Sequence, residues 1–248
     1  MFVKASAASM GTLALIAAGL VSPEGTLAYG WSRTLKLGMS GRDVAELQLR
    51  IAGWAADSAR QTYVAVDGAF GLGTEAAVKR FQRAYGLPVI DGIAGPQTQG
   101  VLNSLESADG STANFNFAEF YSKDGSQFNG GKVDAATVKA NVIRTMFKLE
   151  ALRRKAGNVP VSITSGFRSI RHNASVGGAS NSQHLYGIAA DIRVSGKTPV
   201  QVAELARTCG FSGIIVYNDS NQFVHVDSRA EHAYGAQSFY WPPVGTRE

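Results

Sequence analysis

Apolar side chains recur at intervals of three and four residues in several stretches of the chain, which predicts amphipathic helices. The longest stretch is VDAATVKANVIRTMFKLEALRRKAG, in which Asp134 is a candidate N-cap and Gly157 a helix stop. Another, PVQVAELARTCGF, covers residues 199–211. These stretches predict core helices and call for no functional explanation.

Short apolar runs between these helices predict strands. The runs are VPVSITS, GIAADIRV, SGIIVY and FVHVD. In FVHVD, alternation puts Phe223, His225 and Asp227 on one face and two valines on the other. The valines would pack on a core, and the polar residues would line a cleft. Helices and strands without regular βαβ spacing predict an α+β domain.

The N-terminal half contains an internal repeat. The segments DGAFGLGTEAAVKRFQRAYGL and DGIAGPQTQGVLNSL each combine an Asp-Gly turn, a threonine that could cap a helix, and a short amphipathic helix. The segment GMSGRDVAELQLRIAGW supplies a third helix. Residues 35–105 are therefore predicted to form a small three-helix domain, followed by a Ser-, Asp- and Asn-rich linker at residues 106–114.

The first 28 residues differ from the rest. Lys4 precedes the apolar run GTLALIAAGL, and small residues continue to Ala28. About ten apolar residues are too few to span a bilayer core of about 30 Å. Residues 1–28 are therefore predicted to be a secretory signal peptide rather than a membrane anchor, so that no membrane span is expected after its removal.

Charge and cysteine content limit the function classes. The formal net charge of +5 favours contact with polyanions, which for an exported protein means wall polymers or membrane surfaces. Nucleic acid is not expected as a partner, because no basic cluster with interleaved aromatic residues is present. Cys209 is the only cysteine, which excludes an intrachain disulfide and a cysteine-rich metal site.

Histidine and aspartate residues near strand ends are the candidate chemistry. Two imidazoles and a carboxylate form a normal ligand set for catalytic zinc, and His184, Asp191 and His225 supply these groups. Gly187 permits a turn between the first two. A single strand histidine is more often a hydrogen-bonded structural residue, however, and no H-E-x-x-H motif is present, so the spacing alone leaves both readings open. The other histidines are predicted to lie in loops and face solvent: His172 and His232.

Two family resemblances extend this reading. The pattern LKLGMSGRDVAELQLRI, followed by VDGAFGLGTEAAVKRFQRAYGL and DGIAGPQT, resembles the peptidoglycan-binding module found beside many cell-wall hydrolases. This resemblance implies a non-catalytic, wall-targeting function for residues 35–105. The alternative is a helical domain without a binding function, in which the same residues would serve only to pack the core.

The second half resembles the M15 zinc peptidases, which include D-alanyl-D-alanine carboxypeptidases and wall endopeptidases. The residues that carry the resemblance are SGFRSIRHNASVGGASNSQHLYGIAADI and, downstream, FVHVD. Over residues 115–246 it implies an α+β hedgehog/DD-peptidase-like zinc domain with a mainly antiparallel sheet. It also implies that His184, Asp191 and His225 bind zinc and that Arg168 contacts substrate near the scissile peptide.

The sequence departs from this family at the catalytic base. Many members carry an acidic base three residues before the last zinc histidine, and some carry a histidine two before it, where this chain has Gln222 and Phe223. Neither side chain accepts a proton from a zinc-bound water. Asp227 is then the first candidate for the base, and Asp219 is the second. Asp227 could equally orient a ligand or an arginine, and a further alternative is that catalysis has been lost.

Taken together, the resemblances imply a secreted, monomeric zinc peptidase of the cell wall. It would hydrolyse D-amino-acid-containing peptide bonds of peptidoglycan, first of all as a D-alanyl-D-alanine carboxypeptidase. The alternatives are a cross-link endopeptidase and a wall-binding protein that keeps the fold without turnover. A third reading is an exported module that binds another anionic polymer through its positive charge.

Overall fold

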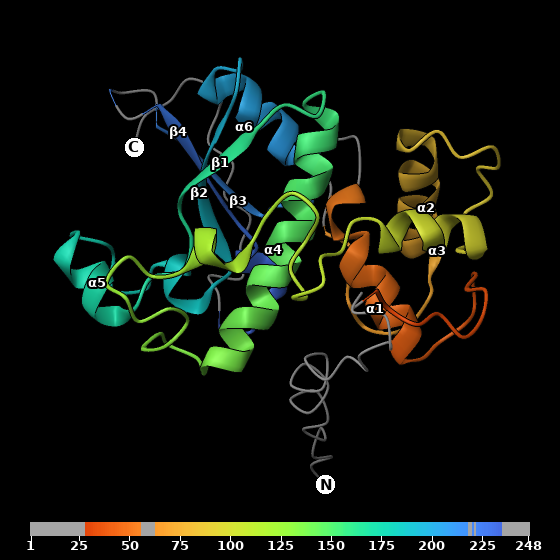
Figure 1. Ribbon diagram of the computed structural model, residues 1–248, viewed down its shortest axis with the longest axis horizontal. Coiled ribbons are helices and arrows are strands. Elements are labelled where there is room, and N and C mark those ends of the chain that lie inside the picture. Colours follow the sequence, from red (N-terminus) through yellow and green to blue (C-terminus); the bar gives the residue numbers. More distant parts are fainter. Residues whose placement is uncertain (1–27, 56–62, 218–219, 221, 235–248) are drawn as a thin grey trace, which may run out of the picture.

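The computed structural model describes residues 28–55, 63–217, 220 and 222–234. A three-helix module and an α/β part lie on opposite sides of one long helix, α4 (Figure 1). The predicted signal peptide falls almost entirely outside the described residues. Within the described part of the chain, no helix has the length and apolar character needed to cross a bilayer.

The N-terminal module contains the three predicted helices. Their bounds are α1 Arg42–Arg50, α2 Leu72–Ala84 and α3 Pro96–Asn103, with a 3-10 turn η1 at Ala52–Trp54. Their inward faces are apolar, and Leu47, Phe81 and Leu102 are fully buried. The predicted three-helix architecture is confirmed.

The sequence repeat of this module corresponds to a repeated pattern of hydrogen bonds. The side chain of Gln48 on α1 accepts from the backbone N–H of Gly68 (2.8 Å) and donates to the Asp67 carboxylate (2.8 Å). On α2, Gln82 makes the same pair of bonds with Gly92 (2.9 Å) and Asp91 (3.0 Å). Each Asp-Gly turn is therefore fixed by a buried glutamine of the preceding helix, so the repeat preserves loop geometry.

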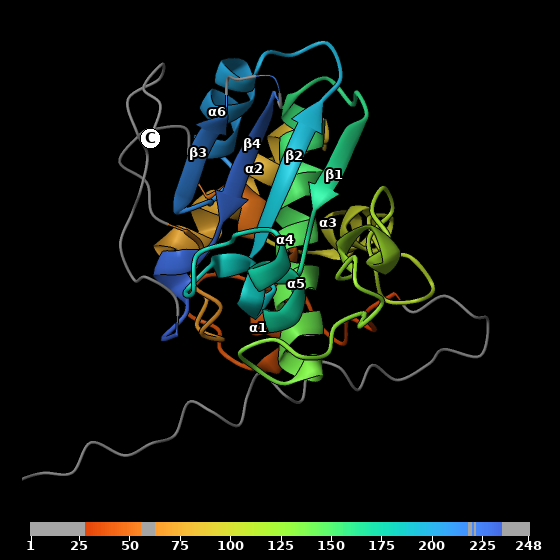
Figure 2. The ribbon, with the colours of Figure 1, turned by 90° about the vertical axis from the view of Figure 1, so that its left-hand side faces the viewer.

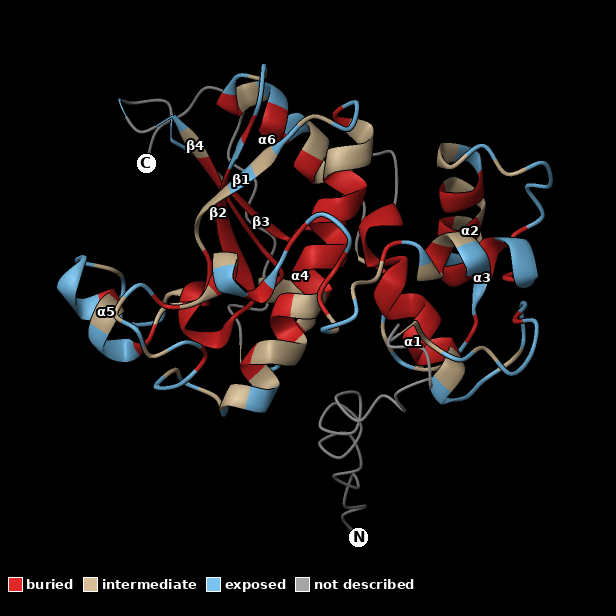
Figure 3. Ribbon diagram, in the orientation of Figure 1, coloured by how far each residue is buried: buried red, intermediate tan, exposed pale blue. Residues whose placement is uncertain are grey.

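Helix α4, Ala135–Lys155, begins and ends where the sequence predicts. Asp134 caps it by accepting from the backbone N–H of Thr137 (2.9 Å), and Gly157 follows its end with φ +94°. Buried residues continue from α1 through α4 into the sheet (Figure 3). One hydrophobic cluster joins the two parts of the molecule.

The module is packed directly against α4. A Cβ at Gly53 in η1 would lie 2.5 Å from the Ala151 Cβ, so only glycine allows this approach. Arg154 of α4 donates to the Ala84 carbonyl (2.8 Å), and the Glu150 carboxylate accepts from Asn114 at the end of the predicted linker (2.8 Å). The three-helix module and the α/β part thus share an interface, although the predicted domain limits themselves stay a prediction.

The α/β part is built on a four-stranded antiparallel sheet of order β1-β2-β4-β3 (Figure 2). The strands are β1 Val161–Ser165, β2 Ala189–Val194, β3 Gly213–Tyr217 and β4 Phe223–Asp227. The remaining elements are η2 Phe117–Phe120, α5 Ile170–Ser175, η3 Gln183–Tyr186, α6 Pro199–Arg207 and η4 Arg229–Glu231. The α+β class and the antiparallel sheet are confirmed.

The two faces of the sheet differ as the FVHVD alternation predicts. Val224 and Val226 are fully buried on the face that packs against the helices. His225 and Asp191 are cross-strand partners on the opposite face. The register between β2 and β4 therefore brings together two polar residues that lie 34 positions apart.

Two histidines lie elsewhere than predicted. His232 is buried (7% exposed) and stacks on Tyr234, and burial lowers its pKa to about 3. His172 lies on the short helix α5, where it is half-buried and lines a cavity. The prediction that His232 faces solvent was wrong, and so was the prediction that His172 lies in a loop, because both judged a local segment without the elements that pack on it.

Candidate metal centre

Three side chains from three separate elements converge on one point. His184 comes from η3, Asp191 from β2 and His225 from β4, and one potential ligand atom of each lies within 4.8 Å of the others. The Asp191 Oδ1 atom is 3.2 Å from His184 Nε2 and 2.9 Å from His225 Nδ1. The two imidazole nitrogens are 3.1 Å apart. All three residues are buried, so they form a compact donor set with little solvent exposure.

Each imidazole has an outward nitrogen that is held by an acceptor and an inward nitrogen that faces the cluster. His184 Nδ1 is 2.6 Å from the Gly166 carbonyl oxygen, which can only accept, so Nδ1 donates and the Nε2 lone pair faces the cluster. His225 lies between two carboxylates, with Nε2 3.0 Å from Asp227 Oδ2 and Nδ1 2.9 Å from Asp191 Oδ1. Burial lowers the pKa of His225, but the hydrogen bonds to these carboxylates outweigh it and raise the pKa to about 9. A metal ion at the cluster would take the place of the proton on Nδ1 while Nε2 donates to Asp227. Two imidazole nitrogens and a carboxylate oxygen thus point to one place, which is a donor set that fits a divalent metal ion.

The η3 turn that presents His184 depends on Gly187. This residue ends η3 with φ +72°, a left-handed conformation that L side chains rarely adopt. A Cβ there would also lie 2.9 Å from the Val138 carbonyl oxygen of α4. The turn expected between His184 and Asp191 is therefore present, and it requires glycine.

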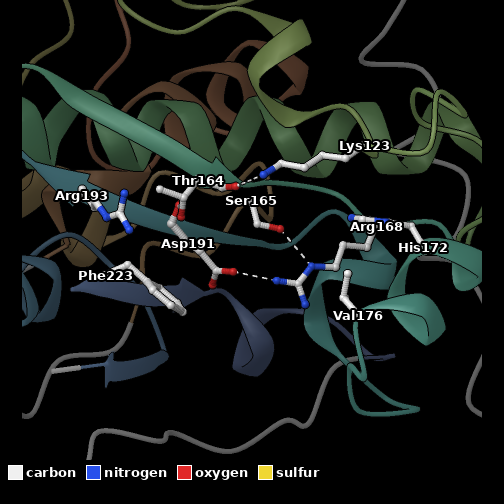
Figure 4. A pocket seen from close by; sticks show the side chains of 9 residues that line it. All are labelled: Lys123, Thr164, Ser165, Arg168, His172, Val176, Asp191, Arg193 and Phe223. Atoms are coloured by element: carbon white, nitrogen blue, oxygen red, sulfur yellow. Dashed lines mark hydrogen bonds and ion pairs between the residues drawn. The ribbon is translucent and has the colours of Figure 1, made fainter. Parts of the chain in front are cut away.

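Arg168 holds the other oxygen of the Asp191 carboxylate. Its Nη2 donates to Asp191 Oδ2 (2.7 Å), and its Nε donates to Ser165 Oγ (2.9 Å) (Figure 4). This pairing leaves Asp191 Oδ1 directed at the two histidines. Burial would raise the pKa of Asp191, but its hydrogen bonds and charges toward His184 and His225 hold the pKa well below its usual range. The carboxylate is thus anionic at neutral pH.

Asp227 lies behind His225 and is fully buried. Its Oδ2 accepts from His225 Nε2 and from Arg229 Nη2 (2.7 Å), and its Oδ1 accepts from the Arg229 backbone N–H (2.9 Å). Burial would raise the pKa of Asp227, but the bonds from His225 and Arg229 hold the pKa well below its usual range. Both oxygens are occupied by these donors, and Asp227 does not line the cavity beside the cluster.

A cavity of about 350 Å³ opens beside Asp191. Figure 4 shows Asp191 between Arg168 on one side and Arg193 and Phe223 on the other. Lys123 reaches the same cavity and donates to the Thr164 carbonyl (2.6 Å). The cluster is therefore accessible to a ligand through Asp191 and Arg168.

The sequence interpretation omitted several cavity residues. Arg193 and Asp191 are two positions apart on one strand and so share a face, which strand alternation could have revealed. Lys123 lies in an irregular segment about 40 residues before the end of β1, and no pattern in the sequence around it identifies it as a cavity residue. Gln222, at the position of the usual base, holds φ +47° and offers its carbonyl to Arg193 Nε (3.3 Å).

Comparison with known proteins gives two family matches. The model described as "Peptidase M15" matches residues 113–227, and the model described as "Putative peptidoglycan binding domain" matches residues 40–102. The two matches fall on the α/β part and on the three-helix module respectively. Both family resemblances seen in the sequence are confirmed.

Individual relatives agree with these matches. The chain is 45% identical over 200 residues to a zinc D-Ala-D-Ala carboxypeptidase of Streptomyces albus G, covering 80% of this chain and 76% of the relative. It is 41% identical over 83 residues to a spore cortex-lytic enzyme of Bacillus cereus, covering 34% of this chain and 30% of that one. Among solved structures, the SleB N-terminal domain is 39% identical and covers 29% of this chain and 90% of that chain, with a TM-score of 0.24. The extent of the first match and the M15 model together establish that this chain belongs to the M15 family of peptidases.

Proposed function

We propose that this chain is a zinc-dependent D-alanyl-D-alanine carboxypeptidase that acts on the stem peptides of peptidoglycan. The observation that carries the proposal is the convergence of two imidazole nitrogens and one carboxylate oxygen at His184, Asp191 and His225. The name of the Streptomyces albus G relative supports both the metal and the bond. The peptidoglycan-binding match supports the polymer.

In this proposal His184 Nε2, Asp191 Oδ1 and His225 Nδ1 hold the zinc ion. When bound, zinc would polarise the scissile carbonyl and supply a water molecule of lowered pKa. Arg168 orients Asp191 through one Nη atom, and its guanidinium borders the cavity, where it can hold the terminal carboxylate of the substrate. The burial of the cluster limits competing water.

Asp227 acts in this scheme as a positioning residue rather than as the base. Its bond to His225 Nε2 fixes the imidazole tautomer and ring orientation, and Arg229 holds the carboxylate in place. The proton acceptor then has to be another group. Asp219, the second candidate base, lies outside the described residues.

Removing the Asp227 carboxylate should weaken zinc binding more than it slows the loaded enzyme. For Asp227→Asn, which keeps the volume, we expect the zinc dissociation constant to rise about 10–100-fold. At saturating zinc, kcat should fall only severalfold. A chelator-competition titration and a kcat measurement at high zinc check this. Unchanged zinc affinity with a kcat loss above about 100-fold would instead identify Asp227 as the base.

The wall location completes the proposal. Action on peptidoglycan places the protein outside the cytoplasmic membrane, and we assign its export to residues 1–28. The module at residues 35–105 would hold the polymer, and residues 115–246 would hydrolyse it. Such a protein can work as a monomer, because all three metal-binding residues come from one chain.

The test is release of D-alanine from a stem pentapeptide that ends in D-alanyl-D-alanine. We expect release by the zinc-loaded protein, loss of release after chelation, and recovery when zinc is returned. A cross-linked stem dimer in a parallel reaction separates the alternatives. Cleavage of the dimer alone would favour an endopeptidase, and zinc binding without cleavage of either would favour a non-catalytic wall-binding protein.

A further inference from the structure

Arg168 borders the cavity, but much of its guanidinium is already bound by the protein. Its Nη2 donates to Asp191 Oδ2 (2.7 Å), and its Nε donates to Ser165 Oγ (2.9 Å). The ion pair with Asp191 also balances the positive charge of Arg168. A substrate carboxylate has two oxygens, and each can accept a charge-assisted hydrogen bond. Arg168 alone therefore gives a terminal carboxylate incomplete binding.

Lys123 supplies a second cation beside Arg168. Its Nζ donates to the Thr164 carbonyl (2.6 Å), and Thr164 immediately precedes the Ser165 that accepts from Arg168. Both cations line the cavity, and Figure 4 shows them reaching it from the same side of Asp191. An ammonium group has three N–H donors, and the carbonyl uses one of them. The exposed Lys123 can therefore donate to a ligand while it keeps its bond to the carbonyl.

The segment that carries Lys123 is bound to the residue after Arg168. The backbone N–H of Ser169, a buried residue, donates to Ser122 Oγ (3.0 Å), and Ser169 Oγ donates to Asp124 Oδ2 (2.6 Å). These two bonds hold the residues on both sides of Lys123. A cation that is held in place before binding loses less conformational entropy when the ligand arrives. Lys123 and Arg168 are therefore preorganised as a pair.

The carboxylates around Lys123 do not balance its charge. The adjacent Asp124 pairs with Arg171, whose Nε lies 3.1 Å from Asp124 Oδ2. Asp191, the only carboxylate that lines the cavity in the described part of the chain, pairs with Arg168. Among the residues that the structure describes, no carboxylate forms an ion pair with Lys123. The cavity thus keeps an uncompensated positive charge beside Arg168, which favours an anionic ligand group there.

We propose that Lys123 binds the free C-terminal carboxylate of the substrate together with Arg168, and so selects removal of a terminal residue over cleavage within a longer chain. This inference rests on the proposed carboxypeptidase activity. A terminal carboxylate accepts one charge-assisted hydrogen bond from each cation. A chain that continues past this point presents a neutral amide, which leaves the Lys123 ammonium without an anionic partner and binds less well.

The test compares two stem pentapeptides that differ only at the C-terminus, one with a free carboxylate and one with a carboxamide. Mass spectrometry follows release of the terminal residue. For the wild-type protein we expect kcat/KM to favour the free acid by about 100-fold, mainly through KM. Lys123→Met should reduce this preference about tenfold by raising KM for the acid, and Lys123→Arg, which keeps the charge, should retain most of it. Lys197→Met, which removes a positive charge outside the cavity lining, should leave the preference unchanged.

Zinc content and the KM values separate binding by Lys123 from a structural role. Zinc should remain at one ion per chain in all three variants, and its loss from Lys123→Met would assign the residue a structural role instead. Equal kcat/KM for acid and amide in the wild type would overturn the inference and leave the proposed function intact. An unchanged KM of Lys123→Met for the acid would do the same. No release from either peptide by the zinc-loaded wild type would contradict the proposed function itself.

Discussion

Replacing His225 by alanine should abolish stoichiometric zinc binding and reduce D-alanine release by about 10³-fold or more. The residue supplies one of three converging donors, and its loss leaves His184 and Asp191 as an incomplete set. A metal ion contributes several kcal/mol to stabilising the transition state, and about 1.4 kcal/mol corresponds to a factor of ten in rate. Metal analysis of the purified variant and a D-alanine assay measure both effects.

The matched control for this variant is His172→Ala. His172 lines the same cavity but is not part of the three-residue donor set, so this variant should retain zinc. His184→Ala should behave like His225→Ala, because its Nε2 faces the same point. Zinc retained at one ion per chain in both ligand variants would contradict the assigned centre.

Replacing Lys148 by methionine should destabilise the protein by about 3–5 kcal/mol. Lys148 is fully buried on α4, and burial lowers its pKa to about 8 although Glu231 opposes the shift. Its ammonium donates to the Gly210 carbonyl (2.7 Å), to Ser228 Oγ (2.7 Å) and to Glu231, whose side chain is also buried. Methionine fills the space but leaves these acceptors without their donor.

Urea unfolding of the zinc-free protein measures this effect. Because part of the cost comes from leaving the buried Glu231 with Arg144 as its remaining ion-pair partner, Lys148→Met combined with Glu231→Gln should be less destabilised than the sum of the single variants. Lys139→Met, on the same helix, should cost less than about 1 kcal/mol, since Lys139 contributes a cation–π contact to Phe117. If Lys148→Met lowered the free energy of unfolding by less than about 1 kcal/mol, the stabilising role of this hydrogen-bond network would be refuted.

The Lys148 network also bears on the metal centre. Ser228 directly follows Asp227, and its backbone N–H donates to the Ile188 carbonyl (3.0 Å) just before β2. α4 thus supports the end of β4 from which Asp227 reaches His225. The positions of the three proposed metal ligands therefore depend on a helix that contributes none of them.

Much of the fold could be predicted because periodicity is local. The Val224 and Val226 positions predicted which face of β4 is buried, and Asp134 and Gly157 predicted both ends of α4. The pairing order of the strands could not be predicted, since it depends on contacts between distant segments. The cross-strand pairing of Asp191 with His225 is such a contact.

The site residues also divide into features that the sequence could predict and features that depend on contacts between distant segments. The three candidate ligands followed from residue type and family resemblance, and their convergence agrees with that expectation. The role of Asp227 stayed open in the sequence because it depends on the direction of its side chain and on Arg229. Lys123 was missed because its approach to Thr164 results from tertiary packing alone.

The most direct test of the metal centre is anomalous diffraction at the zinc edge from crystals of the zinc-loaded protein. We predict one strong peak at about 2.0–2.2 Å from His184 Nε2, Asp191 Oδ1 and His225 Nδ1. The outward nitrogens of the two imidazoles should keep their bonds to Gly166 and Asp227. A peak bound by other residues, or no peak in zinc-saturated crystals, would contradict the account.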